Sequence, residues 1–124
     1  MSNKINSEEN DYTAGDNFFQ QMVEAGIADD NFIREIVEMF LEEGIQTLGK
    51  LRNAFANNES ENVRLFAHKL KSSFLMFDMH EAHSFAMELE EVEGESVLDY
   101  IEVLKELEIA CTSNFDLLRE KYLN

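Results

Sequence analysis

Apolar residues recur at intervals of three and four along most of the chain, which is the pattern of helices that bury one face. The pattern predicts a short helix over residues 17–24 and a long one over about 30–57. Three more follow, over about 59–77, 79–93 and 97–123. Because no segment alternates apolar and polar residues, we expect no sheet.

The boundaries of these helices follow from residues that cap helix ends. Asp16, and either Asp29 or Asp30, precede the first two helices and can accept hydrogen bonds from their free N–H groups. Asn58 and Asp78 each have a glutamate three residues later, the spacing of a capping box, so we expect them to cap the third and fourth helices.

A glycine and a serine are expected at the remaining helix boundaries, and another glycine lies within a helix. We expect Gly94 to end the fourth helix and Ser96 to cap the fifth. Gly44 lies on the apolar face of the long helix, where the missing side chain would let a neighbouring helix approach closely.

The predicted helices fit one domain, since 124 residues are enough for a single apolar core. Residues 1–15 are polar without periodicity and are expected to be a flexible N-terminal leader, with residues 16–124 forming the domain. Four amphipathic helices with short connections pack best as an antiparallel up-down bundle. We therefore expect an all-α fold, a four-helix bundle with a short additional N-terminal helix.

Composition narrows the functional classes. With 26 acidic and 10 basic residues the formal charge is −16, which argues against a nucleic-acid or anionic-membrane partner. No apolar run is long enough to span a bilayer, and no signal-peptide core precedes the domain. The single cysteine, Cys111, cannot form an internal disulfide, and without an export signal we expect a cytoplasmic location. The polar leader and the acidic surface give no reason to expect assembly, so we expect a monomer.

The third helix carries a histidine on the face opposite its apolar one. At 100° per residue, His68 points away from the stripe formed by Val63, Phe66, Ala67, Leu70, Ser73, Phe74 and Phe77. An exposed imidazole is largely uncharged near neutral pH and can act as a nucleophile. Three of the ten basic residues, Arg64, Lys69 and Lys71, lie within eight positions beside it, a local patch that suits a phosphoryl group or an acidic pocket on a partner.

Other kinds of site have less support. His80 and His83 lack the carboxylate partners that metal centres in helical bundles use, so no metal site is expected, and a metal-binding bundle is only a minor hypothesis. Cys111 falls on the inward stripe of the last helix, as a small core residue would. No glycine-rich phosphate loop is present, so nucleotide binding has no visible basis.

The histidine segment resembles the histidine-containing phosphotransfer (HPt) domain family. The family pattern is roughly Ala-His-x-Leu-Lys-Gly-Ser, and the chain reads Ala67-His68-Lys69-Leu70-Lys71-Ser72-Ser73. Two positions depart from the pattern. Ser72 replaces the glycine that follows the lysine, and Asp78 stands where the family usually has a second glycine. The resemblance covers about residues 16–123.

The resemblance implies a phosphorelay intermediate without kinase or phosphatase activity of its own. His68 would accept a phosphoryl group on Nε2 from the aspartyl phosphate of a receiver domain and pass it to another receiver aspartate, while Lys71 neutralises the phosphoryl oxygens. Partners would be response-regulator receiver domains or a hybrid histidine kinase, and the receiver would supply Mg²⁺, so no cofactor of its own is expected. The expected partner contacts are Arg64, Leu65, Lys69, Ser72, Leu75 and Met79.

An alternative of another class is a helical adaptor or inhibitor that binds a signalling partner through the same face without being phosphorylated. The two hypotheses differ in their dependence on His68. Replacing it with glutamine would stop a relay and spare an adaptor, whereas Leu75→Asp would disrupt an adaptor.

Overall fold

The computed structural model describes residues 14–94 and 96–124, and all regular structure within these ranges is helical. The elements are α1 (Asp16–Glu24), α2 (Asp30–Ala56), α3 (Ser60–Met76), α4 (His80–Leu89), the 3-10 helix η2 (Val97–Tyr100) and α5 (Ile101–Tyr122). The predicted all-α class is confirmed. Of the predicted leader, residues 1–13 lie outside the described residues, whereas Ala14 is buried beside α1.

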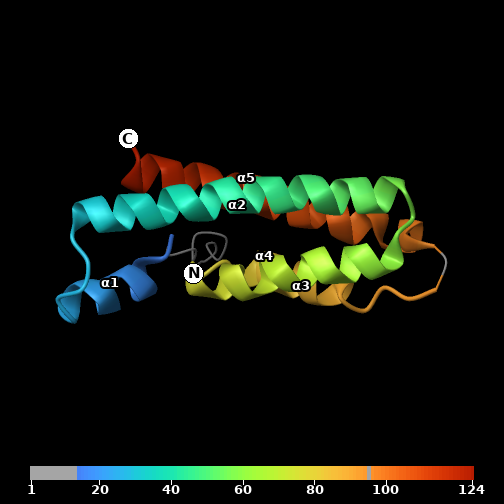
Figure 1. Ribbon diagram of the computed structural model, residues 1–124, viewed down its shortest axis with the longest axis horizontal. Helices are drawn as coiled ribbons and strands as arrows, with labels where there is room; N and C mark the ends of the chain where they lie inside the picture. Colours follow the sequence, from blue (N-terminus) through green and yellow to red (C-terminus); the bar gives the residue numbers. More distant parts are fainter. Residues whose placement is uncertain (1–13, 95) are drawn as a thin grey trace, which may run out of the picture.

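The four longer helices pack side by side around one apolar core (Figure 1). α3 packs against α2 on one side and α4 on the other, and α5 packs against α4 and α2. The helix positions predicted to face inward on α3, among them Val63, Ala67 and Phe74, are fully buried. No helix in the described ranges is both long and apolar enough to cross a membrane.

Aromatic rings fill the core near one end of the molecule. The rings of Phe40 and Phe77 stack with their centroids 3.9 Å apart, and Phe115 meets Phe40 edge-on at 5.6 Å. A Cβ atom added to Gly44 would lie 3.0 Å from Cζ of Phe115. The predicted close approach of a neighbouring helix at Gly44 is therefore confirmed, and the neighbour is α5.

α1 is attached to the end of this core. Its Phe19 is buried and meets the ring of Tyr122 edge-on, with centroids 4.9 Å apart. The Asp16 carboxylate accepts hydrogen bonds from Lys121 Nζ at 2.6 Å and from Tyr122 Oη at 2.8 Å. Asp16 is the first residue of α1, with Gly15 at the N-cap, so its predicted capping role is replaced by this link to α5.

The two turns that flank α3 have the same backbone geometry. Asn58 follows α2 with φ of 55°, and Asp78 follows α3 with φ of 62°, both in the left-handed region. In each turn the N–H of the next residue donates to the carbonyl five residues back, over 2.9 Å in both cases. This is the Schellman motif, which satisfies the last carbonyls of a helix.

The prediction that Asn58 and Asp78 cap the helices after them is therefore wrong. They close the helices before them, because asparagine and aspartate tolerate a positive φ better than other residues with side chains. The N-caps of α3 and α4 are Glu59 and Met79, neither with a side-chain cap bond. The Asn58 side chain instead accepts a hydrogen bond from Val97 N–H at 3.0 Å, tying this turn to η2.

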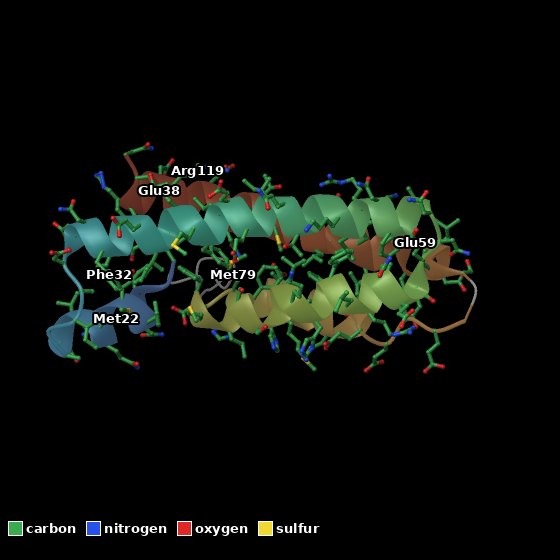
Figure 2. The ribbon with its side chains drawn as sticks, in the orientation of Figure 1. Met22, Phe32, Glu38, Glu59, Met79 and Arg119 are labelled. Atoms are coloured by element: carbon green, nitrogen blue, oxygen red, sulfur yellow. The ribbon has the colours of Figure 1, made fainter. Side chains whose placement is uncertain are left out.

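Met79 does not belong to the surface predicted for partner binding. Its exposed fraction is 0 %, and in Figure 2 it lies inside the bundle, between the α2–α5 pair and the α3–α4 pair. In a Schellman motif the residue after the left-handed position turns back onto the last turn of the helix. Met79 holds that position, and Phe74 of that turn is equally buried. The prediction of a partner contact at Met79 is wrong.

Three other boundaries test the sequence predictions. Asp29 caps α2 as predicted, its side chain accepting a hydrogen bond from Phe32 N–H at 2.9 Å. α4 ends at Leu89, five residues before the glycine expected to end it, and Gly94 instead adopts a φ of 77° in the connection that follows. Ser96 precedes η2 without a side-chain cap bond.

Candidate functional site

His68 lies on the outward face of α3, in the middle of the helix. Its side chain is 67 % exposed, whereas Ala67 and Leu70 on either side of it in the sequence point into the core. Helical periodicity alone produces this contrast, because the packed stripe fixes the rotation of α3. The predicted outward orientation of His68 is confirmed.

A carboxylate holds one nitrogen of the exposed ring. His68 Nδ1 lies 2.5 Å from Oε2 of Glu90, and the other oxygen of the same carboxylate lies 2.6 Å from Lys71 Nζ. Glu90 is the C-cap residue of α4, and the packing of α4 against α3 brings it opposite the middle of α3. The three side chains form a single network, which we call the His68–Glu90–Lys71 network.

The charge state of Glu90 determines what the ring can do. Burial opposes its ionisation, but the hydrogen bonds from Lys71 and His68 outweigh burial and lower the pKa of the Glu90 carboxyl. An ionised carboxylate can only accept hydrogen bonds, so His68 Nδ1 must be the donor. In the neutral ring the lone pair then lies on Nε2, the nitrogen that faces away from Glu90.

The predicted basic residues around His68 do different things. Lys71 joins the network through Glu90 and is 27 % exposed. Arg64 NH1 donates to the backbone carbonyl of Val92 at 2.8 Å, which ties α3 to the segment after α4. Lys69 is exposed and lies on the side of α3 that faces α2. The three cations therefore do not converge on the imidazole.

The apolar surface beside His68 is present as predicted, apart from Met79. Leu65 and Leu75 are 52 % and 48 % exposed, and Met76 is exposed next to Leu75. Ser72 Oγ lies within hydrogen-bonding reach of the carbonyls of His68 and Lys69, at 3.4 and 3.3 Å. A hydroxyl that can donate to its own helix presents little bulk to an approaching partner.

The other reactive groups considered from the sequence were possible metal ligands and Cys111. The described residues contain no group of three or more histidine, cysteine, aspartate or glutamate side chains placed to hold a metal ion. Cys111 is buried, and this burial raises the pKa of its thiol to about 12, far from that of a reactive thiolate.

The comparison with known families gives a match that includes this site. The model of the Hpt domain matches residues 35–114, which is more than half of the chain and runs from α2 into α5. No curated protein and no solved structure matches the chain. Hpt domains are phosphotransfer modules of two-component phosphorelays and not autonomous kinases. The matched segment includes His68, and the chain belongs to the Hpt domain family.

Proposed function

We propose that His68 is the phosphoryl acceptor of a phosphorelay. It takes the phosphoryl group from the aspartyl phosphate of one receiver domain and passes it to the aspartate of another. Family membership supports a phosphotransfer role in general. The observation that supports His68 in particular is an exposed imidazole whose Nδ1 is held by Glu90 at 2.5 Å.

The chemistry follows from the tautomer. The Nε2 lone pair attacks the phosphorus, the bond between phosphorus and the aspartyl oxygen breaks, and the aspartate leaves as a carboxylate. The ring, now bonded to phosphorus at Nε2 and to hydrogen at Nδ1, becomes a cation. Glu90 faces that cation directly and stabilises it, and the return transfer runs the same steps backwards. Such transfers depend mainly on positioning and charge.

Lys71 has a second task in this proposal. It lies one turn from His68, and its ammonium group pairs with Glu90 at 2.6 Å in the absence of phosphate. When a phosphoryl group is attached to the ring, the same ammonium can turn toward its oxygens while Glu90 turns its charge to the imidazolium. Lys71 would thus exchange one anionic partner for another, which limits the cost of adding the phosphoryl charge.

The proposal also covers the surroundings of the site. Leu65, Leu75 and Ser72 form the surface on which a receiver docks, and the receiver supplies Mg²⁺, so the chain needs no cofactor of its own. The proposed protein is a cytoplasmic monomer without kinase activity. The antiparallel up-down order of the four longer helices belongs to the proposal too, supported by the short turns before and after α3.

The test is transfer from receiver domains charged with acetyl phosphate and Mg²⁺, followed by intact-mass analysis at neutral pH. We expect the chain to gain one acid-labile phosphoryl group and His68→Gln to gain none, with an unchanged helical circular dichroism spectrum. His80→Gln is the matched control, because His80 is also exposed but lies in the first turn of α4.

Two results would contradict the proposal. A label that persists in His68→Gln would place the acceptor elsewhere. A folded chain that binds receivers without gaining phosphate would favour the adaptor function instead, and binding should then depend on the exposed Leu75 and not on His68.

A further inference from the structure

Most basic side chains in the described part of the protein are engaged by its own acidic or carbonyl groups. These engaged residues are Arg52, Arg64, Lys71, Lys105, Arg119 and Lys121. Within residues 14–94 and 96–124, Arg34, Lys50 and Lys69 have no ion pair or hydrogen bond through their side chains. In a chain of formal charge −16, these three cations are available to a partner's acidic groups.

Two of these three unpaired cations border the same groove. The groove lies between α2 and α3, has a volume of about 220 Å³, and includes Lys50 from α2 and Lys69 from α3 on its lining. Phe40 and Leu70 contribute apolar side chains to it. We call it the α2–α3 groove. Its two lysines come from segments that only the folded chain brings together.

The groove lies beside the proposed acceptor. Lys69 follows His68 directly, about 100° further round α3. Lys50 lies seven residues before Asn57 and Lys69 nine residues after Ser60, so both stand about 10 to 14 Å from the turn that joins the helices. A domain that covers the His68 ring would therefore extend over the groove.

The polar lining fits a small carboxylate group. Gln46, Thr47 and Ser73 place an amide and two hydroxyls on the lining, all of which can donate hydrogen bonds to carboxylate oxygens. Glu43 also lines the groove, close in sequence to Gln46, and would repel a long anionic segment. The arrangement suits one or two acidic side chains on a partner and does not suit an extended polyanion.

We propose that the α2–α3 groove binds an acidic side chain of the receiver domain that docks over His68, at a position outside the receiver's phosphorylation pocket. The inference rests on the proposed phosphorelay function. Lys50 and Lys69 would attract the partner and fix its orientation without touching the phosphoryl group. Lys69 is then a docking residue, which separates it from Lys71.

The test compares two double charge reversals. Lys50→Glu/Lys69→Glu removes both groove cations, and Arg34→Glu/Lys105→Glu makes the same change in net charge outside the groove. We expect the second-order rate of phosphoryl transfer to fall roughly tenfold or more in the groove variant at low ionic strength, and the loss to shrink as salt is added. The maximum rate at saturating receiver should not change, because the His68–Glu90–Lys71 network is intact.

The outcomes separate this inference from the function it rests on. If the wild-type chain is phosphorylated on His68 and both double variants transfer equally, the groove has no docking role and the relay still stands. If no receiver phosphorylates His68 in the wild type, the relay itself fails. Titration with inorganic phosphate gives a third arm. Phosphate binding that is lost in the groove variant without any loss of transfer would make the occupant a free anion and overturn the inference.

Discussion

The two sides of His68 use their charges in opposite ways. Toward α4, Lys71 and Arg64 are bound by Glu90 and by the Val92 carbonyl, so this side of α3 is closed by contacts within the chain. Toward α2, Lys50 and Lys69 border an open groove without an acidic partner in the described residues. Cations that are paired within the protein fix the geometry of the nucleophile. Cations that are unpaired remain available to the partner.

Removing the Glu90 side chain would remove its contacts with His68 and Lys71. Of the changes predicted here, we expect this one to have the largest effect. In Glu90→Ala the Nδ1 hydrogen loses its acceptor and the imidazolium loses its counter-charge, so phosphoryl transfer should slow by about 10- to 100-fold. Nitrogen-15 NMR of the imidazole should also report that Nδ1–H no longer dominates in the neutral ring. Glu88→Ala, a change at an exposed acid in the last turn of α4, is the control.

The conservative variant separates orientation from charge. Glu90→Gln can still accept from Nδ1 through its amide oxygen but carries no charge, so it should restore the tautomer and recover only part of the rate. If Glu90→Ala keeps both the wild-type tautomer and the wild-type rate, the network would have no part in transfer.

Two glycines of α2 test how the packing of this helix varies along its length. Gly44 packs closely against another helix, and Gly49 does not. Gly44 faces Phe115, which Phe40 confines, so Gly44→Ala should lower the free energy of unfolding by about 1 to 2 kcal/mol. A Cβ at Gly49 would meet nothing within 4 Å, so Gly49→Ala should raise it by about 0.5 to 1 kcal/mol. Urea unfolding of both variants measures the difference, and equal shifts in the same direction would contradict this packing.

The smallest expected effect is the pH dependence of the stability that the His68–Glu90–Lys71 network contributes. The folded-state pKa of Glu90 is lowered from its ordinary value of 4.5, so its network contributes stability above that value and loses it as the pH falls through the folded pKa. The wild type should therefore exceed Glu90→Gln in stability at neutral pH, by less than about 1 kcal/mol for a network at the protein surface, and the gap should close in acid. Urea midpoints across this range provide the measurement, and a gap that widens in acid would contradict the assignment.

The orientation of His68 could be predicted from the sequence because it depends only on the spacing of residues along one helix. Val63, Ala67, Leu70 and Phe74 form a stripe that must face the core, and the stripe determines where every other residue of α3 points. The exposed Leu65 follows from the same reasoning. No knowledge of neighbouring helices is needed for either result.

Glu90 could not be predicted, because its role depends on how α4 packs against α3. It is one of 26 acidic residues, it lies 22 positions from His68, and the expected end of α4 at Gly94 would have put it within a helix. That Lys50 and Lys69 border the same groove could not be predicted from the sequence for the same reason. Contacts between elements are set by packing, which a periodic pattern does not encode.

Asn58 and Asp78 show a different limit of sequence reasoning. Both residue types favour N-caps and left-handed turns, and the glutamate three residues later favoured the first interpretation. In the structure Asp78 takes the left-handed position at the place where the family pattern has a glycine, which explains why this substitution is compatible with the fold. The left-handed conformation of Asp78 also turns Met79 inward. The wrong prediction of an N-cap at Asp78 therefore led to the wrong prediction of an exposed Met79.

The matching turns at the two ends of α3 have a consequence for how this protein can change during evolution. They hold a helix of 17 residues between two fixed stops, so α3 cannot lengthen or shorten without displacing one of them. A single inserted residue between His68 and Phe74 would rotate the imidazole by about 100° relative to the core and carry it away from Glu90. We therefore expect insertions and deletions in descendants of this sequence to accumulate outside α3, while α3 itself changes only by substitution.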